Sequence, residues 1–111
     1  MREKYESAGL NYDLIREDFP DLEVYEDTVA EYLADEFFTE LERYLDDEDY
    51  ELAKDAVKGL YILAGELKLY PLYEALLEIY EDLVYEMYSD VMAHHRDMIE
   101  VHRRIRRIFH V

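Results

Sequence analysis

The feature that most constrains this fold is the lack of any Gly or Pro from Leu72 to the end of the chain. Apolar side chains, with one histidine among them, recur there at steps of three and four residues, the period of one helix face. The positions are Leu72, Leu76, Ile79, Leu83, Met87, Val91, His94, Met98, Val101, Ile105 and Ile108. A single helix of this length would reach about 60 Å and could not bury its stripe in so short a chain. We therefore predict a turn near Tyr85–Asp90, with Ser89 capping the last helix.

The N-terminal third predicts two helices. A short amphipathic helix is expected within Met1–Phe19, and Pro20 ends it because proline disfavours the helical conformation in its predecessor. Asp21 is a suitable N-cap for a second helix, and the helical period continues from Val24 to Leu45. The side chains expected to face the core are Leu10, Leu14 and Ile15, then Val24, Tyr25, Thr28, Val29, Tyr32, Leu33, Phe37, Leu41, Tyr44 and Leu45.

The middle of the chain predicts two more helices. The four acids of residues 46–49 are a poor helix C-terminus, so we expect a turn there, with Asp47 as N-cap of a helix over residues 48–66. Pro71 is expected at the first position of the next helix. Together these elements predict an all-α fold: an antiparallel, up-down-up-down four-helix bundle with a short additional N-terminal helix, in one domain over residues 1–111.

Charge limits the classes of partner. The net charge is −17, and it is uneven: residues 1–95 carry 27 acids and 7 bases, whereas residues 96–111 carry 2 acids and 5 bases. Such a body should repel nucleic acid and anionic membranes. The chain has no cysteine, and it has neither a long apolar run nor a signal-peptide pattern. We expect a cytoplasmic monomer without a cofactor, a metal, a nucleic acid or a membrane partner.

Two of the three glycines fall inside the predicted helix over residues 48–66. Its apolar stripe is Ala53, Ala56, Val57, Leu60, Leu63, Ala64 and Leu67. A glycine in mid-helix costs about 1 kcal/mol relative to alanine, so Gly59 needs a reason, and the usual one is close approach of another backbone or a partner. Asp55 and Ile62 lie one turn to either side of it, opposite the stripe. The pattern predicts a shallow exposed spot flanked by an acid, Lys58 and an apolar side chain.

These residues resemble the motif of the histidine-containing phosphotransfer (HPt) domain of two-component phosphorelays. Lys58, Gly59, Gly65 and Leu69 stand at the spacing of that family, but Asp55 occupies the position of its phosphate-accepting histidine. The likeness covers roughly residues 8–84. It implies that Lys58 would lie beside the phosphoryl group and that Gly59 would let a response-regulator domain dock closely.

The change at Asp55 implies a binding module rather than an enzyme. In the family a neutral imidazole nitrogen attacks an aspartyl phosphate, and a carboxylate has no such nitrogen. We therefore predict no catalytic residue, and a face of Lys58, Gly59, Ile62 and Gly65 that docks a receiver or histidine-kinase domain of a bacterial two-component system without carrying phosphate. Three alternatives remain open. Asp55 could be an ordinary solvated residue on a scaffold that has lost its catalytic role. Phosphate could instead pass through another histidine, of which His95 is the least unsuitable, or the chain could be a structural protein that dimerises through one unbroken helix over residues 72–109.

The last helix holds all four histidines. His94 lies on the apolar stripe, which predicts a partly buried, hydrogen-bonded side chain. A metal set of Glu86, Asp90 and His94 is the alternative, but two or three ligands from one helix make a weak site.

Two further groups of side chains remain ambiguous. Five arginines could bind phosphate, although cations at a helix C-terminus or pairs with acids of the early helices explain them as well; they are Arg96, Arg103, Arg104, Arg106 and Arg107. The many tyrosines after residue 60 either line the edge of the core or form a docking patch around Tyr61, Ile62 and Tyr73.

Overall fold

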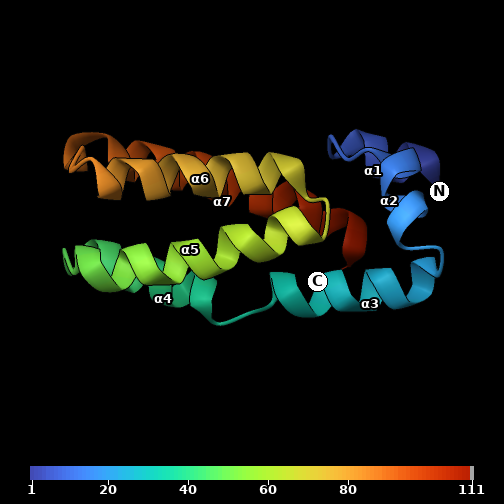
Figure 1. The fold of residues 1–111 in the computed structure, drawn as a ribbon, viewed down its shortest axis with the longest axis horizontal. Helices are drawn as coiled ribbons and strands as arrows, with labels where there is room; N and C mark the ends of the chain where they lie inside the picture. Colours follow the sequence, from blue (N-terminus) through green and yellow to red (C-terminus); the bar gives the residue numbers. More distant parts are fainter. Residues whose placement is uncertain (111) are drawn as a thin grey trace.

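The computed structural model describes residues 1–110, and every regular element in that part of the chain is an α-helix. The helices are α1 (Arg2–Ser7), α2 (Tyr12–Asp18), α3 (Leu22–Leu33), α4 (Phe37–Asp46), α5 (Tyr50–Glu66), α6 (Tyr70–Val84) and α7 (Tyr88–Phe109). Helices α4 to α7 lie lengthwise along the long axis, with α6 and α7 in one layer and α4 and α5 in the other (Figure 1). The α4–α5 and α6–α7 turns lie at one end of the molecule. Helices α1, α2 and α3 lie toward the opposite end, beside the last turns of α7.

The core follows from the helical stripes. Helix α5 buries Ala53, Val57, Leu60 and Ala64, and α6 buries Leu72, Leu76, Ile79, Asp82 and Leu83. Leu63, predicted to belong to the stripe of α5, is 44% exposed instead. The far end is closed by aromatic rings from three helices, with Tyr5, Tyr25 and Phe109 packed at centroid separations of 5.6 to 6.3 Å. Aromatic rings bury large areas, so they suit this junction of short helices.

The predicted continuous helix from Val24 to Leu45 is wrong, because the chain breaks into α3 and α4 at residues 34–36. Asp35 accepts a hydrogen bond from the amide of Phe37 at 2.8 Å, and such a side chain competes with the helical ladder. Beyond the break the register changes, so Phe37 is 49% exposed rather than buried. Val24 was also expected in the core but is 60% exposed, because the buried face of α3 is the one that carries Tyr25 and Val29. The break also lets α3 contact α7 while α4 packs against α5.

Three short turns of one kind join α4 to α7. In each, a residue just past the helix end has a left-handed backbone: Glu48 at φ 57°, Lys68 at φ 60° and Glu86 at φ 58°. The amide of the next residue then returns to a carbonyl five residues earlier, as from Asp49 to Tyr44 at 2.8 Å and from Met87 to Asp82 at 2.7 Å. This is the Schellman arrangement, which reverses the chain sharply after a helix.

Several predicted boundaries need correction. The turn expected near Tyr85–Asp90 is confirmed. Ser89 does not cap the last helix as predicted: it lies inside α7, and the N-cap of α7 is Met87. The side chain that caps α5 belongs to Asp49 rather than Asp47. Asp21 does cap α3, accepting from the amide of Val24 at 3.2 Å.

Two other boundaries differ slightly from the expectation. Pro71 lies one position inside α6, which begins at Tyr70. The N-terminal segment forms two short helices, separated at Gly9, where φ is +79°. Within residues 1–110 no helix combines the length and apolar character needed to cross a membrane.

Candidate functional site

The face of α5 that carries the motif is turned to solvent. Asp49 begins the helix by accepting a hydrogen bond from the amide of Leu52, and the apolar stripe anchors the opposite side to α4 and α6. Asp55, Lys58 and Gly59 are all exposed, as the sequence predicts. Ile62, one turn further on, is 44% exposed.

The two glycines of α5 have different surroundings. A Cβ atom on Gly59 would meet nothing within 4 Å, so no internal packing requires glycine at this position. A Cβ atom on Gly65 would lie 3.2 Å from a ring carbon of Tyr73, which is tighter than ordinary contact. Gly65 therefore makes room for α6, whereas Gly59 leaves an unoccupied spot on the outer surface.

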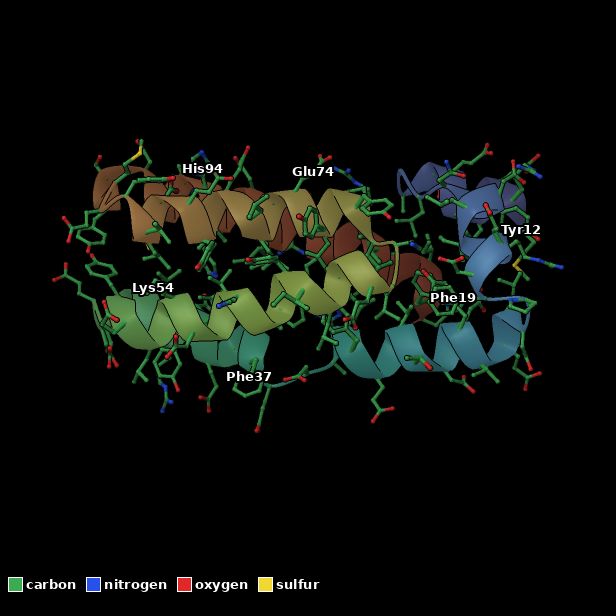
Figure 2. The ribbon with its side chains drawn as sticks, in the orientation of Figure 1. Tyr12, Phe19, Phe37, Lys54, Glu74 and His94 are labelled. Atoms are coloured by element: carbon green, nitrogen blue, oxygen red, sulfur yellow. The ribbon has the colours of Figure 1, made fainter. Side chains whose placement is uncertain are left out.

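A groove of about 300 Å³ lies beside Gly59 between α4 and α5. Its lining comprises Phe37, Tyr44, Leu52, Asp55, Ala56 and Gly59, and is mostly apolar. Phe37 and Leu52 are each about half exposed, and Phe37 lies at the outer edge of the α4–α5 layer, away from α6 and α7 (Figure 2). The groove was not predicted from the sequence, because the apolar period placed Phe37 in the core of one continuous helix.

The polar groups at the groove are few. Among residues 1–110 neither Asp55 nor Lys58 takes part in an ion pair or a side-chain hydrogen bond; the neighbouring Lys54 pairs with Glu51 at 3.4 Å. Nor does the described chain bring three His, Asp or Glu side chains together in a group that could hold a metal ion. The groove thus offers an apolar floor whose polar side chains are the carboxylate of Asp55 and the hydroxyl of Tyr44. That arrangement suits protein contact better than covalent chemistry.

His94 is hydrogen-bonded and partly buried, which confirms the prediction for this residue. Its Nδ1 lies 2.5 Å from the Oδ2 atom of Asp82, and its Nε2 lies 3.8 Å from the Oε2 atom of Glu78. The predicted metal partners were Glu86 and Asp90, but the carboxylates that contact His94 belong to α6. The hydrogen bond to Asp82 raises the pKa of His94.

His95, on the neighbouring position of α7, is only 3% exposed. It lines a second groove of about 340 Å³ between α4 and α7, together with Phe38, Glu42 and His102. Burial lowers the pKa of His95, although the carboxylates of Glu42 and Asp46 oppose that shift. His95 is therefore a neutral, enclosed imidazole near pH 7.

His102 has a structural partner. Its Nε2 donates to the carbonyl of Leu33 at 2.9 Å, so α7 satisfies a carbonyl freed where α3 ends. The ring also packs on Phe38, with centroids 4.2 Å apart. Burial lowers the pKa of His102, which favours the neutral imidazole at this position.

The structure shows the contacts of the arginines and tyrosines that the sequence left ambiguous. Four of the five arginines make no ion pair within the described chain, and Arg103 pairs with Glu100 of its own helix rather than with an early helix. Tyr61 packs against Tyr73 and Tyr80, with centroids 5.8 and 5.3 Å away. Both Tyr61 and Tyr73 are partly buried against the core, so Ile62 alone of the predicted patch is exposed.

Comparison with known proteins adds no relative: no protein-family model, no curated protein and no solved structure matches the chain.

Proposed function

We propose that this chain is an HPt-like docking module that binds a receiver or histidine-kinase domain of a bacterial two-component system without carrying phosphate. In this proposal α3 and α4 act as one broken helix, which completes an up-down-up-down four-helix bundle with α5, α6 and α7. The short helices α1 and α2 cover one end. The proposed setting is the cytoplasm, and the proposed state before docking is a monomer.

The observation that carries the proposal is the open space over Gly59. Glycine weakens a helix, and here no internal neighbour requires it. A partner can approach the α5 backbone closely at this point and insert an apolar side chain into the groove lined by Phe37 and Leu52. Lys58 stands beside the spot as a cation without a partner in the described chain, available to an acid on the partner's surface.

The residue at position 55 argues against phosphate transfer by the family's chemistry. A carboxylate lacks the neutral nitrogen that forms a phosphoramidate, and receiver-type phosphorylation of aspartate depends on a metal ion with neighbouring acids. Asp55 stands alone on the exposed face of a helix. Its negative charge is what a docking partner would meet.

Two of the alternatives are less favoured by the geometry. His95 is almost fully enclosed, so phosphate transfer through it would need α4 and α7 to separate first. Dimerisation was expected to need one unbroken C-terminal helix, but the turn of residues 85–87 separates α6 from α7.

The test is a titration against receiver domains from the same genome, phosphorylated and unphosphorylated, with binding read by calorimetry and transfer by radiolabel. Saturable binding without label on the chain supports the proposal. The variant Gly59→Gln should abolish binding without loss of thermal stability, because the added side chain projects into open space. Ala93→Gln, at an exposed position on α7, is the matched control and should bind normally.

Two results would overturn the proposal. Label transferred to the wild-type chain would show phosphotransfer and direct attention to its histidines. An absence of binding to every receiver and kinase domain tested would leave the resemblance as a property of the fold alone. If binding is found, Asp55→His should be tested for gain of label, which would show that the acceptor position is correctly aligned.

A further inference from the structure

A cluster of exposed hydrophobic side chains surrounds the turn between α6 and α7. Twelve large hydrophobic side chains in residues 1–110 are exposed, and five of them fall between residues 84 and 92. They are Val84 at 42%, Tyr85 at 70%, Met87 at 47%, Tyr88 at 37% and Met92 at 37% exposure. We call these five residues the tip surface. Isolated exposed hydrophobics are ordinary, but a concentration of five around one turn is typical of a contact site.

The choice of Met87 is not explained by the fold. It is the N-cap of α7 and makes no side-chain hydrogen bond, whereas Asn11 and Asp21 cap α2 and α3 with their side chains. Leu69, the N-cap of α6, also lacks such a bond, but it is completely buried in the core. Met87 is half exposed, so it gives up the capping bond without a compensating core contact. Contact with a partner would explain why an apolar side chain stands at this N-cap position.

The tip surface is surrounded by negative charge. Residues 44–53 and 78–93 hold ten acids and no Lys or Arg. The acids are Asp46, Asp47, Glu48, Asp49, Glu51, Glu78, Glu81, Asp82, Glu86 and Asp90. Asp82 is buried against His94, and the other nine are exposed. The ring of Tyr50 stacks on that of Tyr88 with centroids 4.0 Å apart, which places the turn before α5 beside the tip surface, at the same end of the molecule (Figure 1).

We propose that the tip surface binds a basic amphipathic helical segment of another protein. The apolar face of that segment would cover the five exposed side chains, while its Lys and Arg side chains would reach the surrounding acids. Methionine adapts its shape to different apolar partners, and tyrosine presents an apolar ring with a polar hydroxyl. This second surface is separate from the Gly59 spot and does not depend on the proposed docking of receivers.

Other occupants fit less well. An anionic membrane would be repelled by the nine exposed acids. A second copy of the chain offers basic residues on the last turns of α7, but none of the exposed large hydrophobics lies beyond Met92. The side chains Ile105 and Phe109 of that segment are buried, so it could supply charge without an apolar face.

The experiment uses a fluorescent model peptide of about 18 residues, long enough for five helical turns. Leu residues occupy one face of its helix and Lys residues occupy the opposite face. A peptide of the same composition, scrambled so that no apolar face forms, is the control for charge alone. Binding is read by anisotropy at about 0.15 M salt, where charges more than about 8 Å apart are screened. One variant of the chain carries both Tyr85→Ser and Met87→Ser. The matched control is Val24→Ser, at a position of α3 whose side chain is 60% exposed.

We expect the patterned peptide to bind at least about tenfold more tightly than the scrambled one. The double variant should lose that difference, whereas Val24→Ser should keep it. Met87→Ser alone should raise the melting temperature, because serine can cap α7, and still weaken binding. Equal binding of both peptides, or unchanged binding by the double variant, would overturn the proposal. A mass that grows with protein concentration and reverts in the double variant would assign the surface to a second copy instead.

Discussion

His94 on α7 and Asp82 on α6 are joined by a 2.5 Å contact between Nδ1 and Oδ2. Asp82 is 4% exposed, whereas His94 is partly exposed and also faces Glu78. The hydrogen bond to Asp82 raises the pKa of His94 and outweighs the opposing effect of burial. The contact therefore links the two helices most strongly when the imidazole is protonated.

The first prediction concerns pH. Because the folded pKa of His94 lies above the unfolded value of about 6.5, the pair contributes fully below that pH, and its charge-dependent part is lost as pH rises through the folded pKa. His94→Gln should lower the free energy of unfolding by about 2 kcal/mol near pH 6, with a smaller loss at high pH. Urea unfolding across a pH series measures this. Glu78→Gln is the control and should have little effect; a loss independent of pH for His94→Gln would contradict the assignment.

The second prediction compares the two glycines of α5. Gly59→Ala should raise the free energy of unfolding by about 1 kcal/mol, because alanine favours the helix and its Cβ meets nothing. Gly65→Ala should gain less, since its Cβ would press on the Tyr73 ring at 3.2 Å. Chemical denaturation of both variants gives the comparison. Equal gains would mean that α6 yields to the added methyl group and that Gly65 has no packing role.

The third prediction concerns the left-handed residues of the turns. Glu48 and Glu86 have positive φ without being glycine, so Glu48→Gly and Glu86→Gly should each stabilise the fold by about 1 kcal/mol. Glu48→Gln separates the backbone effect from the loss of one negative charge. Lys68→Gly should gain less, because it also breaks the 3.0 Å ion pair with Asp18. If Glu48→Gln matches Glu48→Gly in its melting temperature, charge rather than backbone geometry is responsible.

The fourth prediction concerns two buried tyrosine hydroxyls on α3. Tyr25 donates to the carbonyl of Leu67 and Tyr32 to that of Leu60, each at 2.6 Å. Tyr25→Phe and Tyr32→Phe should each lower the free energy of unfolding by about 1 to 2 kcal/mol, because each removes a buried hydrogen bond between a hydroxyl and a carbonyl. Tyr12→Phe is the control, since the hydroxyl of Tyr12 makes no hydrogen bond within residues 1–110. A loss as large in Tyr12→Phe would indicate that these bonds are not the cause.

Local sequence signals predicted much of the candidate site. The apolar period of α5 correctly placed Asp55, Lys58 and Gly59 on the solvent side, because burial of one stripe forces the opposite face outward. The groove beside them was not predictable in the same way. It depends on Phe37, whose exposure follows from the chain break at Asp35, and on the position of α4 against α5.

The sequence by itself determined that the chain is helical, that Asp21 begins a helix and that residues after Val84 must turn. These features depend on neighbours within a few positions, where periodicity and capping act. The tertiary structure alone decided that α3 and α4 separate and that His95 rather than His94 is fully enclosed. Bonds such as that from His102 to Leu33, 69 residues apart, stabilise the break between α3 and α4, and a contact at that separation leaves no trace in a local pattern.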